Sequence, residues 1–186
     1  RSLGSEMCIR DSHKHHTVEL AKAVDGLLRQ SGIKPTDLSA LAVAKGPGSF
    51  TSLRIGLAFV KGLALAQSMP VIGIPSLDIV AAAVPIGSYA LLAVLQAGRD
   101  RLAVARYEVV EDTWMSVDQP IICDIQGVLN LIKGSIMVAG ELNPAQRHLL
   151  SDGRKHILVA KPALCLRRPS YLAELAWKRH LNTDYD

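Results

Sequence analysis

The stretch AKGPGSFTSLRIGLAFVKGLA, from Ala44 to Ala64, decides how this sequence folds. A turn of Gly46, Pro47 and Gly48 separates an apolar run from a helix rich in small residues, a layout in which many proteins hold a phosphate. The two common phosphate-loop patterns both fail here, because each requires a glycine that the sequence lacks, for example at Thr51. Pro47 also removes a backbone N–H that would face a phosphate. A phosphate site is therefore possible here only in a form that departs from both patterns.

The helix predicted over Ser49–Gln67 carries a stripe of Ala58, Gly62 and Ala66, spaced four residues apart. A mid-helix glycine costs roughly 1 kcal/mol relative to alanine, so Gly62 calls for a packing reason. A nearly bare stripe lets a second backbone approach closely, which suggests a partner helix. The alternative, that this chain fills both sides of the helix itself, is equally open from periodicity alone. The opposite, apolar face consists of Leu53, Leu57, Val60 and Ala64.

Working outward, strands alternate with helices along the whole chain, which predicts an α/β fold. Gly-Arg-Asp at Gly98–Asp100 predicts a hairpin turn. Ser49, Ser76 and Ser170 are expected to cap helices. Helices are expected over 17–32, 49–67, 76–84, 124–132, 143–150 and 168–181, and strands over 38–46, 70–76, 89–98, 101–110, 135–140 and 156–160.

The composition limits the classes of function. The 186 residues are 49% hydrophobic but only 4% aromatic, and the net charge of +4 is spread along the chain, which fits ordinary solubility better than nucleic-acid binding. Cys8, Cys123 and Cys165 are odd in number and far apart, so neither a disulfide framework nor a zinc site is expected. A reducing, cytoplasmic setting fits best. No apolar run reaches the roughly 18 residues of a membrane span.

The first twelve residues, RSLGSEMCIRDS, have no periodicity and stop where an amphipathic helix begins. They resemble the translation of a sequencing-library adapter, and we treat residues 1–12 as a non-native segment. The alternative is a natural N-terminal tail. The remainder is expected to form two domains, over residues 13–86 and 87–186.

The motif GPGSFTSLRIGLAFVKGLA, followed by PVIGIPSL, resembles the TsaB (YeaZ) family at nearly every position. Ser52 replaces a glycine of the family motif, and His16 matches a histidine on the preceding helix. LLAVLQAGRDRLAVARY resembles the family's later hairpin, but Gln96, Ala97 and Gly98 depart from its usual Asp-Ala-Arg. The resemblance covers most of His13–Leu181.

This resemblance implies an actin-like ATPase fold of the sugar-kinase and Hsp70 type, with two RNase H-like halves. It implies a non-catalytic subunit for N6-threonylcarbamoylation of adenosine 37 in tRNAs that read ANN codons. Such a subunit pairs with the catalytic TsaD paralogue, or with itself, and the pair binds the ATPase TsaE; tRNA is reached only through the complex. Carried onto this chain, the partner-binding residues would be His16, Leu20, Val24, Leu27, Phe50, Leu53, Arg54, Leu57, Ala58, Lys61 and Gly62.

The enzyme alternative is an active paralogue of the same fold, a threonylcarbamoyl transferase or a kinase-like protein. The resemblance implies that TsaD uses two histidines four residues apart as metal ligands after the next strand. The matching stretch here, Ile74–Ala83, contains no histidine, and the cluster His13–His16 offers no helical pair for one metal. We therefore expect no metal, cofactor or catalytic residue.

The family also opens with a strand bearing Asp-Thr-Ser and a strand hairpin, and neither precedes His13. We therefore expect a fragment whose first half lacks its N-terminal strands and whose C-terminus is also short. An RNase H-like sheet would place the first strand beside 38–45. Its loss exposes unpaired backbone groups, so the chain is expected to aggregate or dimerise.

Overall fold

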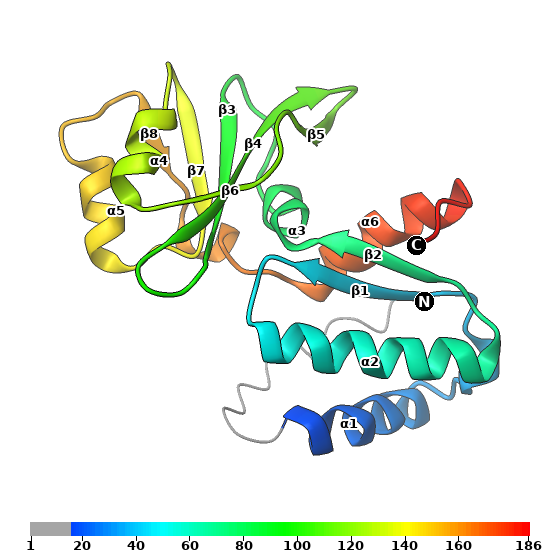
Figure 1. Ribbon diagram of the computed structural model, residues 1–186. Coiled ribbons are helices and arrows are strands. Elements are labelled where there is room, and N and C mark those ends of the chain that lie inside the picture. The colour runs from blue at the N-terminus through cyan, green and yellow to red at the C-terminus, as the bar shows by residue number, and fades with distance from the viewer. Residues whose placement is uncertain (1–15) are drawn as a thin grey trace. The chain divides into compact units, whose positions relative to one another are not determined.

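The computed structural model describes residues 16–186, with side chains from Glu19 onward. The described chain forms two compact units (Figure 1). Unit 1 consists of the described residues up to Pro75 together with Arg168–Asp186, and unit 2 of Ser76–Arg167. The C-terminal helix therefore returns to the N-terminal unit, and each unit is built by its own sheet and helices.

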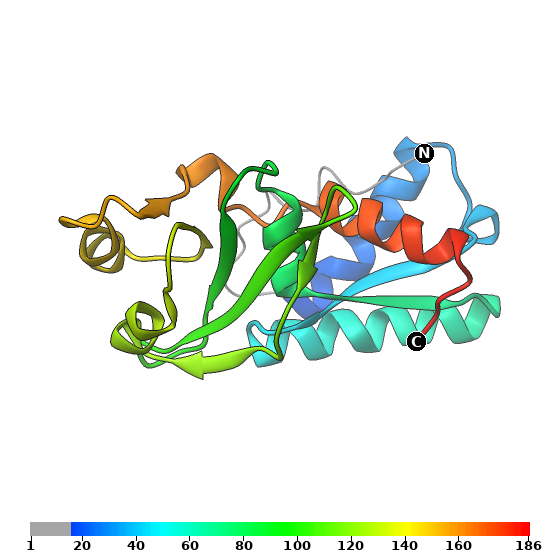
Figure 2. The same ribbon diagram turned by 90° about the horizontal axis from the view of Figure 1, so that it is seen from above.

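Unit 1 is a parallel pair of strands with helices on both faces. β1 pairs with β2 in a register that places Leu41 opposite Val71. α2 lies on one face of this pair and α6 on the other, while α1 packs on α2 (Figures 1 and 2). The elements are α1 His16–Gln30, η1 Pro35–Asp37, β1 Leu41–Gly46, α2 Phe50–Gln67, β2 Val71–Pro75 and α6 Pro169–Leu181.

The glycine turn between β1 and α2 has a local structural reason. Gly46 has φ 108°, in the region that side chains disfavour, and an added Cβ would lie 3.2 Å from Leu53 Cδ1. Ser49 occupies the N-cap position of α2, but its side chain makes no capping bond. The turn therefore redirects the chain from β1 into α2. The prediction that the Ser49 hydroxyl caps this helix is wrong.

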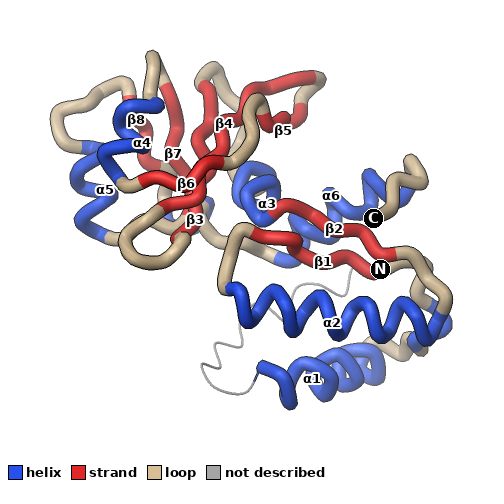
Figure 3. The backbone as a smooth tube through the Cα atoms, viewed as in Figure 1, coloured by secondary structure: helices blue, strands red, loops and turns tan. Residues whose placement is uncertain are grey.

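Unit 2 is built on a mixed sheet in the order β5-β4-β3-β7-β8, with β6 also paired to β4 (Figure 3). β3 and β4 form the antiparallel hairpin expected around Gly98–Asp100, and β3, β7 and β8 are parallel. The elements are α3 Ser76–Ala82, β3 Ala90–Gln96, β4 Leu102–Val110, β5 Thr113–Ser116, β6 Ile121–Cys123, α4 Ile125–Leu131, β7 Ile136–Gly140, α5 Pro144–Ser151, β8 Ile157–Val159 and η2 Pro162–Leu164.

The core of unit 2 lies on both faces of β3. Leu91, Ala93 and Leu95 pack with residues of α3, whereas Leu92 and Val94 pack with residues of α4 and α5. This period of two is the pattern of a strand that is covered on both faces. The hydrophobic run at residues 90–95 is therefore a central strand.

Most of the expected elements are confirmed, and the observed α/β architecture supports the actin-like fold class. β5 and β6 were not expected from the sequence. Ser76 is the first residue of α3, and its buried hydroxyl has no hydrogen-bond partner among the described residues. Ser170 lies inside α6, whose N-cap is Arg168, so neither serine caps its helix. The domain boundary near residue 86 stays a prediction, since the compact units divide at Pro75 and Arg167. No helix among residues 16–186 is long and apolar enough to cross a membrane.

Candidate protein-docking surface

The outward face of α2 is unusually apolar for an exposed helix face. Phe50 is 72% exposed, Leu65 is 85% exposed and Leu57 is 36% exposed, although all three are large hydrophobic residues. Together with their exposed neighbours on the same side they form a surface that we call the α2 ridge. The α2 ridge consists of Phe50, Arg54, Leu57, Ala58, Lys61, Gly62, Leu65 and Ala66.

Gly62 of the ridge takes no part in packing within residues 16–186. A Cβ built on Gly62 would meet no described atom within 4 Å. A Cβ added to Gly56, on the inner side of α2, would instead lie 4.0 Å from Val43 Cγ2 of β1. Gly62 therefore lowers the stability of α2, and no packing contact within the described part of this chain offsets that cost.

The ridge carries positive charge beside its apolar residues. The Arg54 guanidinium lies 5.2 Å from the centre of the Phe50 ring, a cation–π distance that also shields part of the ring. Neither Arg54 nor Lys61 forms an ion pair with a described carboxylate. A partner surface with small apolar residues and one or two acidic groups would complement this ridge.

The structure does not bring all the expected partner-binding residues together. Six of them lie together on the ridge, namely Phe50, Arg54, Leu57, Ala58, Lys61 and Gly62. Leu53 is half-buried beside the turn, and Leu20, Val24 and Leu27 of α1 line an apolar groove inside unit 1. The side chain of His16 lies outside the described residues. Leu65 was missed, although its four-residue spacing from Lys61 placed it on this face.

The metal chemistry of the catalytic alternative does not fit the residues of α3. This helix, which forms most of the stretch Ile74–Ala83, buries Leu77, Ile79 and Val80 in the core. Its carboxylate, Asp78, accepts a hydrogen bond of 2.6 Å from the Tyr107 hydroxyl. No three His, Cys, Asp or Glu side chains in the described range are grouped so as to hold a metal ion.

A polar cluster of unit 2 joins the ends of β3 and β7. The Gln96 backbone N–H donates to the Glu141 carboxylate at 3.1 Å, and the Gln96 side-chain amide donates to the Gln146 side-chain oxygen at 3.0 Å. Arg167 pairs with the other Glu141 oxygen at 2.6 Å. These groups satisfy one another, so they stabilise the loop after β7 rather than present free polar atoms to a ligand.

Comparison with known proteins connects the chain with one biosynthetic process. A family model described as "TsaD: tRNA N6-adenosine threonylcarbamoyltransferase" matches residues 10–165. The tRNA threonylcarbamoyladenosine biosynthesis protein TsaB of Escherichia coli (strain K12) is 43% identical over 72 residues, which are 39% of this chain and 29% of that protein. TsaB of Bacillus subtilis (strain 168) is 44% identical over 69 residues, 37% of this chain and 30% of that protein.

Catalytic relatives and solved structures match as well. A tRNA N6-adenosine threonylcarbamoyltransferase of Nitratidesulfovibrio vulgaris (strain DP4) is 46% identical over 63 residues, 34% of this chain and 17% of that protein. The structure of YeaZ from Pseudomonas aeruginosa superposes with a TM-score of 0.76 at 21% identity, over 93% of this chain and 80% of that chain. The matches thus span less than a third of each of these curated relatives. The resemblance to TsaB (YeaZ) proteins expected from the Ala44–Ala64 motif is confirmed.

Proposed function

Because the chain belongs to the family described as TsaD: tRNA N6-adenosine threonylcarbamoyltransferase, we propose that it serves the biosynthesis of threonylcarbamoyladenosine in tRNA as a non-catalytic partner subunit. Its role is to dock on a catalytic TsaD-type subunit through the α2 ridge. The same ridge would join two copies of this chain when the catalytic subunit is absent. A TsaE-type ATPase would bind the resulting pair, and tRNA would be reached indirectly through the complex, in the cytoplasm.

The exposed Gly62 is the observation that carries this proposal. A buried glycine would be explained by internal packing, but this one faces open space among the described residues and still lies inside a helix of 18 residues. The neighbouring Leu65 and Phe50 expose apolar surface, which water disfavours and a partner would cover. Small residues between larger apolar ones allow a second helix to approach closely, as in ridge-into-groove packing.

The choice of a partner role over the transferase role rests on side chains. Curated matches of both kinds reach similar identity, so identity alone does not separate TsaB from the transferase. The stretch Ile74–Ala83 lacks histidine, and its carboxylate is engaged with Tyr107. Docking, by contrast, requires only the surface that α2 offers.

The test is co-purification of the tagged chain with a TsaD-type subunit from the same source. Gly62→Leu adds bulk on the ridge while removing a helix-interior glycine, so the variant should fold at least as well as the parent and yet lose binding. Gly26→Leu is the matched control, because Gly26 is also a helical glycine with open space around its Cβ, but on α1.

Equal retention of the catalytic subunit by the Gly62 and Gly26 variants would refute docking through the ridge. Transfer of the threonylcarbamoyl group by the isolated chain, given tRNA and threonylcarbamoyl-adenylate, would support the catalytic alternative instead. Co-elution that Gly62→Leu alone abolishes, with no such activity in the isolated chain, is the expected result.

A further inference from the structure

The helices that cover one face of the unit 2 sheet leave the second half of β4 uncovered. Leu102 and Val104, at the start of β4, are buried together with Val128 of α4. Arg106 and Glu108 are the next residues on the same face, and they expose 34% and 51% of their side chains. The helical layer on the α4 side of the sheet therefore ends before the second half of β4.

Large apolar side chains lie on this uncovered part of the sheet. Met115 of β5 pairs with Glu108 and so shares its face, and alternation adds Val110 and Val117. These three apolar residues are between 50% and 52% exposed. Ile121 of β6, which pairs with a buried residue of β4 on this face, is 44% exposed. We call the surface the β4–β5 face; its strands are drawn in Figure 3, and it consists of Arg106, Glu108, Val110, Met115, Val117 and Ile121.

The opposite side of β5 is held firmly by the core of unit 2. The ring of Trp114 lies 6.2 Å from the ring of Tyr89, and its Nε1–H donates to the Val84 carbonyl at 2.8 Å. Trp114 also packs against the cluster of buried residues that includes α3. The exposure of Met115, its neighbour in the chain, therefore belongs to a strand that is fixed in place.

Carboxylates surround the β4–β5 face. The residues from Tyr107 to Asp124 include no Lys or Arg, and all their acidic side chains belong to exposed residues. Glu108 is paired with Arg106 at 2.9 Å, whereas three others form no ion pair with a cation of residues 16–186. The unpaired three are Glu111, Asp112 and Asp118. An apolar centre with a negative rim complements an apolar surface that carries positive charge.

The turn between β4 and β5 places two of these charges beside Val110. Glu111 has φ 48° and Asp112 has φ 54°, so both lie in the left-handed region. Two-residue hairpin turns of this kind favour Asn-Gly, because a side chain such as that of glutamate is disfavoured there. The hairpin thus carries two negative charges at its tip against the preference of its own backbone.

A helix suits this surface better than a second copy of the chain. An apolar sheet face is normally buried by a helix, and α4 already provides one beside the β4–β5 face. Two copies that met through this same face would bring their carboxylates together. Contact between this face and the α2 ridge of another copy would be heterologous, and such contacts lead to rings or open filaments.

We propose that the β4–β5 face binds one amphipathic helix of a partner protein, with an apolar stripe flanked by Lys or Arg residues. The stripe packs on Val110, Met115 and Val117, and the basic side chains pair with Glu111 and Asp112 at the hairpin tip. This contact goes beyond the proposed docking function, because it lies on unit 2 and does not involve the α2 ridge.

The test uses the full chain, with its methionine methyl groups labelled for NMR, and three synthetic peptides. The first, Lys-Leu-Lys-Lys-Leu-Leu-Lys repeated twice, has all its leucines on one face of a helix. The second, Lys-Leu-Lys-Leu-Leu-Lys-Lys-Leu-Lys-Leu-Lys-Lys-Lys-Leu, has the same composition with the leucines spread around the helix. The third is the first with Glu in place of every Lys. We expect the first peptide to shift the Met115 methyl resonance and to bind at least tenfold more tightly than the other two.

Three variants connect binding with the face. Met115→Lys and Glu111→Lys each change an exposed side chain, so the urea midpoint should stay near that of the parent and affinity for the first peptide should fall at least tenfold. Leu158→Lys is the matched control, because Leu158 is a 42% exposed residue of β8, at the opposite edge of the same sheet. Gly62→Leu, which alters the α2 ridge, should bind the peptide like the parent even if docking on a TsaD-type subunit fails.

Equal binding of the first two peptides would overturn the proposal, and so would binding that leaves the Met115 methyl resonance in place. Binding that Leu158→Lys weakens as much as Met115→Lys would show that the peptide recognises no particular face. A Met115 resonance that shifts with protein concentration alone, and stops doing so in Gly62→Leu, would make the α2 ridge of a second copy the occupant.

Discussion

The Tyr107 hydroxyl donates a hydrogen bond of 2.6 Å to the Asp78 carboxylate, which joins the middle of β4 to the first turn of α3. The Tyr107 side chain is 2% exposed, so water cannot replace the bond. Hydrogen bonds to a charged group contribute about 1.5–3 kcal/mol. We expect Tyr107→Phe to lower the free energy of unfolding by that amount in urea denaturation.

Tyr89→Phe is the control for this prediction. The Tyr89 hydroxyl donates to the neutral Pro85 carbonyl at 2.9 Å and lies near the surface. Its removal should cost about 1 kcal/mol or less. Equal losses in the two variants would show that the charge of Asp78 adds nothing to the Tyr107 bond.

The same pair predicts a loss of stability in alkali. Burial, and then the Asp78 charge and hydrogen bond, raise the pKa of Tyr107 far above its ordinary value of 10.0. The unfolded chain loses this phenolic proton near pH 10, whereas the folded chain retains it. The contribution to stability is therefore complete below pH 10 and falls as the pH rises above it.

The measurement is the urea midpoint of the parent chain and of Tyr107→Phe at successive alkaline pH values. Since the phenylalanine variant has no phenol at this position, its stability should decline less steeply. Parallel declines would mean that Tyr107 ionises in the folded protein as it does in water.

Two glycine-to-alanine substitutions should have opposite effects. Gly62→Ala meets no neighbour on the α2 ridge and should stabilise the chain by up to about 1 kcal/mol. Gly140 has φ 126°, and an added Cβ would collide with the Val94 carbonyl oxygen on the neighbouring strand. Gly140→Ala should therefore destabilise unit 2 by more than about 2 kcal/mol. Thermal melts of both variants test the contrast, which a loss of stability in Gly62→Ala would contradict.

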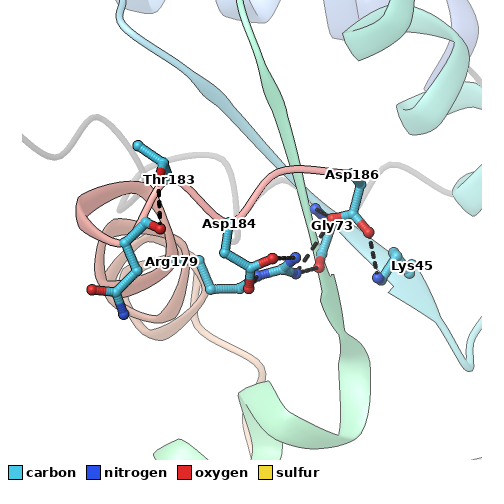
Figure 4. Close-up of polar contacts among 7 residues, drawn as sticks. Lys45, Gly73, Arg179, Thr183, Asp184 and Asp186 are labelled. Atoms are coloured by element: carbon cyan, nitrogen blue, oxygen red, sulfur yellow. Dashed lines mark hydrogen bonds and ion pairs between the residues drawn. The ribbon is translucent and has the colours of Figure 1, made fainter.

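The C-terminal residues cover one edge of β2, where the Asp186 carboxylate accepts the Gly73 N–H at 2.6 Å and pairs with Lys45 at 2.8 Å (Figure 4), and this edge should open in acid. The hydrogen bond from Lys45, and then that from the Gly73 N–H, hold the pKa of Asp186 below its ordinary value of 3.8. A lowered carboxyl pKa stabilises the fold above about pH 3.8, and the contribution is lost as the pH falls through the folded pKa. Asp186→Asn should therefore speed hydrogen exchange at the Gly73 amide at neutral pH.

This difference between Asp186→Asn and the parent should shrink in acid, where the parent loses the same charge. Asp25→Asn is the control, because Asp25 pairs with Arg29 on the exposed face of α1, away from this cluster. A Gly73 amide equally protected in all three proteins would show that the C-terminal residues do not close this edge.

The strongly periodic elements could be predicted from the sequence, whereas short and half-polar ones could not. The run Leu91–Leu95 and the helix Phe50–Gln67 follow directly from hydrophobic spacing. β5 and β6 have four and three residues, most of them polar or exposed, and both pair with the nine-residue strand β4. The Tyr107–Asp78 bond spans 29 residues and leaves no local signal.

The sequence also could not predict which face of a helix is buried and which is exposed. Periodicity assigned Leu20, Val24 and Leu27 to one face of α1, and the structure turns that face into the apolar groove of unit 1. An apolar residue in a helix normally indicates core, whereas Leu65 is 85% exposed. A face becomes inner or outer only once its neighbours are placed, and that information is tertiary.

Leu65 gives the most direct test of the ridge. Its side chain is 85% exposed, so Leu65→Ala removes little internal packing and should leave the urea midpoint of the chain unchanged. If a TsaD-type subunit covers this side chain, the variant loses about 2 kcal/mol of binding free energy, which corresponds to an affinity about thirtyfold lower. Leu149→Ala is a matched control, because Leu149 is a 41% exposed leucine on α5 of unit 2. Titration calorimetry with the catalytic subunit should separate the two variants. An unchanged affinity for Leu65→Ala would move the contact away from the end of α2, since a leucine this exposed can lose its methyl groups silently only where no partner covers it.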